Sequence, residues 1–228
     1  MIKTKKKLII IIAIGVILSF GIYRITINNK YNLLSLGDSL ASGMTIYNVN
    51  GYSYTDYLKD YLKDNNELNN YNNIFVEPGM TISELQTKIN NNFIKTYNGK
   101  EITIQQALKS SNMIIIGIGI DELNELAAKK ALTQKNINIY LKNMETLLKI
   151  IKKYNNKKVI VLGIYNTYYF TNANEINSKI EKLSNKYSYD FVDISKVINN
   201  DIYFFENSSY YLNYKGHKEI SRVLEKSL

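Results

Sequence analysis

The first residues in the chain that could do chemistry are Gly37-Asp38-Ser39-Leu40, which follow the largely apolar residues 33–36. A strand that ends at a small residue can present a serine hydroxyl at the edge of a sheet, where it can act as a nucleophile. Glycine permits the sharp turn that a side chain would obstruct. Four residues are also compatible with an ordinary strand-to-loop turn, so we rely on the position of Ser39 after the first strand of an alternating pattern.

Other kinds of site have little support in the composition. The chain has no cysteine, which excludes disulfides, thiolate chemistry and a lipid-modified cysteine anchor. Its one histidine is His217, so a zinc site built on histidines is nearly excluded. We therefore predict neither a metal nor a cofactor.

The formal net charge of +9 does not indicate a nucleic-acid partner. Six of the 29 basic residues precede residue 31, and no acidic residue does. The rest of the chain contains 23 basic and 20 acidic residues, so its formal net charge is only +3. That balance is typical of an ordinary solvated surface and not of a phosphate-binding one.

The N-terminal residues predict a membrane anchor. Residues 8–23 carry no charge and follow a cluster of lysines. As a helix this run spans about 24 Å, and continuing to residue 27 with Arg24 reaching outward brings it to the roughly 30 Å of a bilayer core. We expect a cytoplasmic basic tail (1–7), a transmembrane helix (8–27), a linker (28–31) and an extracellular domain (32–228).

Two other interpretations of the same segment remain open. Ser19-Phe20-Gly21 is a passable small-x-small site, so the segment can be a cleaved signal peptide. A buried helix of a soluble protein fits less well, because of the flanking lysines. Whether the segment is an uncleaved anchor or a cleaved signal peptide, the domain works outside the membrane.

The elements that would position Ser39 alternate between strands and helices. We predict strands at residues 32–36, 74–76, 113–116, 159–162 and 191–193, with a polar loop at 65–73. We predict helices at residues 54–62, from 82, and at 101–110, 134–154, 175–187 and 214–226. The most apolar strand, 113–116, suits the middle of a parallel sheet that is covered on both faces. This order predicts one α/β domain, a three-layer α/β/α sandwich with a central parallel sheet.

Together with the first motif, two further stretches make the chain resemble the SGNH (GDSL) hydrolase family over nearly all of residues 32–228. They are Gly119-Ile120-Asp121-Glu122-Leu123 and the segment from Asn213 to Ile220. The resemblance implies a flavodoxin-like fold and hydrolysis of an ester without a cofactor. It also implies that Ser39 is the nucleophile and that its backbone N–H donates to the oxyanion. Gly79, in Pro78-Gly79-Met80-Thr81, matches the glycine of the family's second block.

The same resemblance places unusual residues at the other catalytic positions. Asp121 stands where the family has the asparagine that donates to the oxyanion, and Tyr211 where it has the catalytic histidine. The triad aspartate falls on Ser208 or Ser209. Two of the family's four named residues, Ser39 and Gly79, are therefore present.

These replacements weaken the expectation of catalysis. Tyrosine, with a pKa near 10, is a poor acceptor for the proton of a serine. An ionised Asp121 offers no donor and brings negative charge to the oxyanion site, and only a protonated Asp121 could donate. His217 could replace the missing base, but it lies six residues beyond Tyr211. A histidine at a helix start that bonds locally is the favoured interpretation.

We therefore keep several functional hypotheses. The first is an extracytoplasmic carboxylic-ester hydrolase that acts on an acyl group of a surface glycan, a lipid or a small ester. The second is a catalytically inactive relative that binds an acylated envelope glycan, lipid or protein. A third, weaker hypothesis is a tethered envelope protein whose fold serves only as an interaction surface. All three exclude a nucleic-acid partner.

Overall fold

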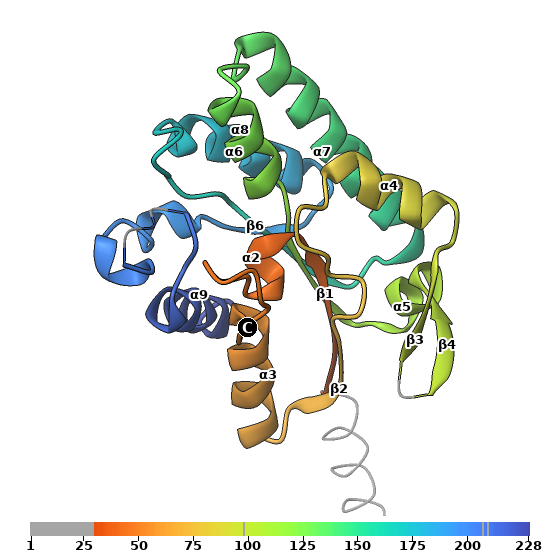
Figure 1. The fold of residues 1–228 in the computed structure, drawn as a ribbon. Helices are drawn as coiled ribbons and strands as arrows, with labels where there is room; N and C mark the ends of the chain where they lie inside the picture. The colour runs from red at the N-terminus through yellow and green to blue at the C-terminus, as the bar shows by residue number, and fades with distance from the viewer. Residues whose placement is uncertain (1–29, 98, 207, 209) are drawn as a thin grey trace, which may run out of the picture.

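The computed structural model describes residues 30–97, 99–206, 208 and 210–228. A five-stranded parallel sheet forms the middle layer (Figure 1). Its strands are β1 (Tyr31–Gly37), β2 (Leu68–Asn72), β5 (Met113–Gly117), β6 (Lys158–Leu162) and β7 (Asp190–Val192), in the order β2-β1-β5-β6-β7. This is the strand order of flavodoxin-like folds. The central parallel sheet with flanking helices that the sequence predicts is therefore confirmed.

The middle of the sheet is its most apolar part. All five residues of β5 are buried, and Ile115 of this strand pairs with Ser35 of β1 on one side and Ile160 of β6 on the other. Parallel strands covered on both faces are continuous apolar runs, as here. The edge strand β2 has a neighbour on one side only and is largely polar.

Helices cover both faces of the sheet. On one face α3 (Tyr54–Asp64) packs against α9 (Tyr214–Glu225). On the other face α7 (Gln134–Tyr154) contacts α4 (Ile82–Asn90), α5 (Ile104–Ser110) and α8 (Ala173–Lys186) (Figure 1). Short elements complete the chain: α2 (Ser39–Ser42), α6 (Ile120–Ala128), and the 3-10 helices η1 (Ile194–Lys196) and η2 (Asp201–Tyr203).

The predicted second strand at 74–76 is wrong. The strand is Leu68–Asn72, within the segment that we expected to be a polar loop. Residues 74–76 form a turn instead, in which the Asn72 side chain accepts from the N–H of Ile74 and Val76 donates to the carbonyl of Asn73. An edge strand needs little apolar surface, so its hydrogen bonds to β1 suffice for an asparagine-rich sequence.

The predicted helix at 101–110 begins later than expected. A hairpin of β3 (Ile94–Tyr97) and β4 (Lys100–Thr103) precedes it, and α5 starts at Ile104. The Thr103 side chain accepts from the N–H of Gln106, and this cap fixes the helix start. The sequence analysis also missed α6, which follows Gly119 directly.

Successive strands are added to the sheet on opposite sides of β1: β2 lies on one side, and β5, β6 and β7 follow on the other. Residues that follow β1 and β5, Ser39 and Gly119, therefore lie at the same carboxyl edge, where parallel α/β sheets bind ligands. Tyr31, the first residue of β1, lies at the opposite edge.

The predicted basic tail (1–7) and transmembrane helix (8–27) lie outside the described residues. In the part of the chain that the structure describes, no helix has the length and apolar character needed to cross a membrane.

Candidate active site

Ser39 is the first residue of α2, immediately beyond β1. Residue 37, just before the turn, is glycine because β1 and β5 approach closely there. A Cβ on Gly37 would lie 2.1 Å from the carbonyl oxygen of Gly117. Asp38 caps α2, with its Oδ1 accepting from the N–H of Leu40 at 3.2 Å. Only 8% of Ser39 is exposed to solvent.

Asp38 joins the loops that follow the two central strands. Its Oδ2 accepts from the N–H of Gly119 at 2.7 Å and from the N–H of Asp121 at 3.4 Å. The carboxyl is fully buried, and burial raises its pKa well above the usual range, with a further contribution from the charge of Asp121. The sequence analysis gave Asp38 no role, although its place between Gly37 and Ser39 was a signal that could have suggested one.

The Asp121 carboxylate occupies the position next to the candidate nucleophile. Its Oδ2 accepts from the backbone N–H of Ser39 at 3.0 Å and from the backbone N–H of Gly79 at 2.8 Å. The N–H of Ser39 is the oxyanion donor that the resemblance names, and Gly79 is the glycine of its second block. A carboxylate oxygen thus already takes the hydrogen bonds that would stabilise an oxyanion. The other oxygen of Asp121, Oδ1, is buried with no hydrogen-bond partner among the described residues.

Tyr211 shares a pocket with Ser39. Burial, and then the charge of Asp121, raise the pKa of its phenol above the usual value of 10. A phenol with a raised pKa stays protonated at neutral pH, so it can donate a hydrogen bond but cannot take the proton of a serine.

Ser208, a candidate for the position of the triad aspartate, uses its hydroxyl within the local backbone. Its hydroxyl oxygen accepts from the N–H of Tyr211 at 3.0 Å and from that of Tyr210 at 3.2 Å, which makes it part of a tight turn. The alternative position, Ser209, lies outside the described residues.

His217 lines the same pocket, although it lies six residues beyond Tyr211. Its ring stacks on Tyr54, with centroids 6.4 Å apart, and its Nδ1 has no hydrogen-bond partner among the described residues. The expectation of a locally bonded ring is therefore wrong for Nδ1, because the ring points into the packed interior. Burial lowers the pKa of His217 to about 4, so the ring is neutral at physiological pH.

The pocket itself is almost filled by side chains. Its volume is about 10 Å³, which is room for at most about one water molecule. Its lining includes Ser39, Ile120, Tyr165, Tyr210, Tyr211, Leu212 and His217. Sequence analysis missed Tyr165, whose hydroxyl donates to the carbonyl of Tyr210 at 2.7 Å; its place just beyond β6 was the available signal.

The described residues contain no group of three or more His, Cys, Asp or Glu that could hold a metal ion. The groups that the described residues bring to the site are a serine hydroxyl, two carboxyls, a phenol and a neutral imidazole.

A serine after the first strand of a flavodoxin-like sheet, whose own N–H converges with that of Gly79 from a second loop, is typical of the GDSL-type hydrolases. The sequence pattern of the family described as "GDSL-like Lipase/Acylhydrolase" matches residues 33–220, and the chain belongs to this family. No curated protein matches the sequence.

Solved structures show the same fold at low identity. A lipase from a goat rumen metagenome has a TM-score of 0.68 at 16% identity, covering 86% of this chain and 96% of that one. A family 3 carbohydrate esterase from Clostridium thermocellum has a TM-score of 0.63 at 16% identity, covering 86% and 94%. A lipase/acylhydrolase from Enterococcus faecalis has a TM-score of 0.63 at 12% identity, also covering 86% and 94%.

Proposed function

We propose that this chain is a membrane-anchored, extracytoplasmic member of the GDSL family that does not hydrolyse esters through Ser39 and acts by binding. One observation carries the proposal. The Asp121 carboxylate accepts the backbone N–H groups of both Ser39 and Gly79.

The energetic reason is the charge that develops during acyl transfer. Removing one good oxyanion donor costs on the order of 10² to 10³ in rate. Here both backbone donors are already engaged, and an ionised carboxylate would repel the negative oxygen of a tetrahedral intermediate. The substrate carbonyl would first have to displace Asp121 from two hydrogen bonds.

The missing base supports the same proposal. Tyr211 is protonated at neutral pH, and Ser208 uses its hydroxyl within a turn. Without an acceptor for its proton, a serine hydroxyl is a weak nucleophile.

A second candidate function is ester hydrolysis with His217 as the base. It is favoured by the neutral ring of His217, whose Nδ1 is unpartnered and which lines the same pocket as Ser39. Its weakness is the pKa of about 4, which makes the imidazole a poor proton acceptor.

The proposal includes the location of the domain on the outer side of the membrane. The uncharged residues 8–23 after a lysine cluster support an anchor with the N-terminus in the cytoplasm. Protease added to intact cells should then remove the domain and leave a small N-terminal fragment. Full protection of the domain would contradict the outward orientation.

The test of inactivity is labelling of the full chain with a fluorophosphonate, which reacts with activated serines. We expect no labelling above that of Ser39→Ala. Strong labelling that is lost in both Ser39→Ala and His217→Ala would overturn the proposal and establish the second candidate.

A further inference from the structure

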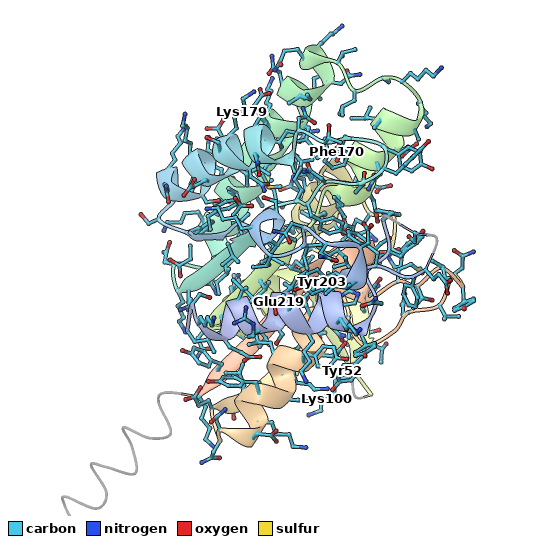
Figure 2. All side chains as sticks on the ribbon, turned by 90° about the vertical axis from the view of Figure 1, so that its left-hand side faces the viewer. Tyr52, Lys100, Phe170, Lys179, Tyr203 and Glu219 are labelled. Atoms are coloured by element: carbon cyan, nitrogen blue, oxygen red, sulfur yellow. The ribbon has the colours of Figure 1, made fainter. Side chains whose placement is uncertain are left out.

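Three loops surround the candidate active site at the carboxyl edge of the sheet. They are residues 43–53 after α2, 163–174 from the end of β6 into the start of α8, and 197–213 before α9, of which 207 and 209 lie outside the described residues; we call them the rim loops. Figure 2 labels one residue of each loop: Tyr52, Phe170 and Tyr203. Side-chain contacts connect the loops: the rings of Tyr47 and Phe205 meet edge to face at 6.4 Å, and Tyr165 donates to Tyr210.

The composition of the rim loops differs from the rest of the chain. Their 40 residues contain none of the 29 lysines and arginines and only two acids, Asp201 and Glu206. They hold eight of the 20 tyrosines, together with many asparagines. In a chain this rich in lysine, the lack of basic residues and the abundance of aromatic and amide side chains are local properties of these loops.

Hydrogen bonds within the first rim loop fix its conformation and leave its tip exposed to solvent. Gly51 donates to the carbonyl of Gly43 at 2.8 Å, and Thr45 donates to the carbonyl of Val49 at 3.0 Å. Between these bonds Tyr47 is 74% exposed, and Val49 is exposed beside it.

The second rim loop presents a pair of tyrosines in the same way. Thr167 donates through its N–H to the carbonyl of Phe170 at 2.9 Å and through its hydroxyl to Asn124 at 2.7 Å. At the tip of this turn Tyr168 is 82% exposed, and its ring meets that of Tyr169 edge to face at 5.5 Å. Ordered tips lose little conformational entropy when they bind a ligand.

We propose that the rim loops bind a neutral polysaccharide. Tyrosine rings stack on the C–H faces of sugar rings, while asparagine side chains and phenol groups exchange hydrogen bonds with sugar hydroxyls. The absence of lysine and arginine argues against an anionic lipid surface or a nucleic acid, since both are bound through basic residues. The proposal rests on the proposed function in one respect only: the domain acts by binding.

The test is co-sedimentation of the full chain, in detergent micelles, with insoluble chitin, cellulose and neutral mannan. We expect binding to at least one of them, reduced about tenfold or more in the Tyr47→Ala/Tyr168→Ala double variant. The matched control is Tyr61→Ala, an exposed tyrosine on α3 outside the rim loops, which should bind as the wild type does.

Two results would overturn the proposal. One is no binding to any of the three polysaccharides, or binding that the double variant retains. The other is binding to phosphatidylglycerol vesicles that falls in the double variant, which would identify a lipid surface; the difference between variants is the measure, because the N-terminal segment itself is expected to enter lipid. Labelling of Ser39 by a fluorophosphonate would overturn the proposed inactivity and leave the rim-loop result unaffected.

Discussion

The two halves of the candidate active site are built in different ways. The nucleophile half, around Ser39, Gly79 and Asp121, is fixed by hydrogen bonds from backbone N–H groups in the loops after β1, β2 and β5 to the carboxyls of Asp38 and Asp121. The base half, from Ser208 to His217, consists of side chains on a loop and the first turn of α9. A base depends on one side chain, so it can be lost with no effect on the sheet, whereas the backbone donors are part of the fold.

On the proposed function, the comparison explains how a chain could keep the architecture of a serine hydrolase without its base. The backbone N–H groups of the buried Ser39 and the exposed Gly79 still converge, and an unpaired buried donor such as that of Ser39 would cost free energy. The Asp121 carboxylate satisfies both.

The largest effect should come from rebuilding the base half together with the donor. Asp121→Asn, Tyr211→His and Ser208→Asp restore an amide, an imidazole and its carboxylate. Because such groups act as a unit, we expect the triple variant to hydrolyse p-nitrophenyl acetate about 10² or more times faster than any single variant. Adding Ser39→Ala should abolish the gain. A triple variant as inactive as the wild type would mean that the nucleophile half is not a preformed catalytic half.

The nucleophile half should be sensitive to small changes in the backbone. The methyl group of Gly37→Ala would lie 2.1 Å from the Gly117 carbonyl oxygen, so β1 and β5 would have to move apart. We expect a loss of about 3 to 4 kcal/mol in the free energy of unfolding, measured by urea denaturation of fragment 30–228. Ser35→Ala, on the same strand, is the control; its buried hydroxyl has no partner among the described residues, so stability should not fall. Equal stability of both variants would contradict the close approach.

In the base half, the burial of His217 should make the free energy of unfolding depend on pH. The folded pKa of His217, about 4, lies below the ordinary 6.5. The unfolded chain therefore binds the proton more readily between these values, and the free energy of unfolding should fall by about 3 kcal/mol as the pH drops from 7.5 to 4.

The control for this effect is His217→Phe, which keeps a ring on Tyr54 and removes the titration. It is needed because Asp38, with its raised pKa, acts in the opposite direction and stabilises the fold as the pH falls. An identical pH profile in wild type and variant, measured by urea unfolding, would mean that the ring is solvated.

The smallest effect is expected at the turn of the base half. Ser208→Ala removes the acceptor of the Tyr210 and Tyr211 N–H groups, which should cost about 1 kcal/mol, since partly exposed donors can turn to water. Thermal unfolding would measure it. A loss as large as that of Gly37→Ala would remove the distinction between the two halves.

Strong periodicity made most of the fold predictable. The helix at 134–154 was predicted with its observed bounds, and the strand at 113–116 lies within β5, because long amphipathic and continuous apolar patterns have few other solutions. The edge strand β2 and the hairpin β3–β4 were missed. Their asparagine- and lysine-containing sequences form strands through pairing alone, which a pattern of burial does not reveal.

The structure brings three of the predicted site residues together, but the sequence did not predict their contacts. The motifs placed Ser39, Gly79 and Asp121 at the ends of different segments, and the parallel sheet brings those ends to one edge. That one oxygen of Asp121 accepts from both Ser39 and Gly79 depends on loop conformations at the scale of 1 Å, which no spacing encodes. His217 was considered as a replacement base, with a locally bonded ring favoured; in the structure the helix start turns the ring inward, toward the pocket.

The position of Tyr31 has a consequence for how several molecules would act together. β1 runs for seven residues, about 23 Å, from Tyr31 at one edge of the sheet to the edge that carries the rim loops. Copies anchored through residues 8–27 would share one plane and direct their rim loops to the same side, away from the bilayer. A long polymer could then contact many copies at once, so that weak individual contacts add up to strong attachment through a high effective concentration.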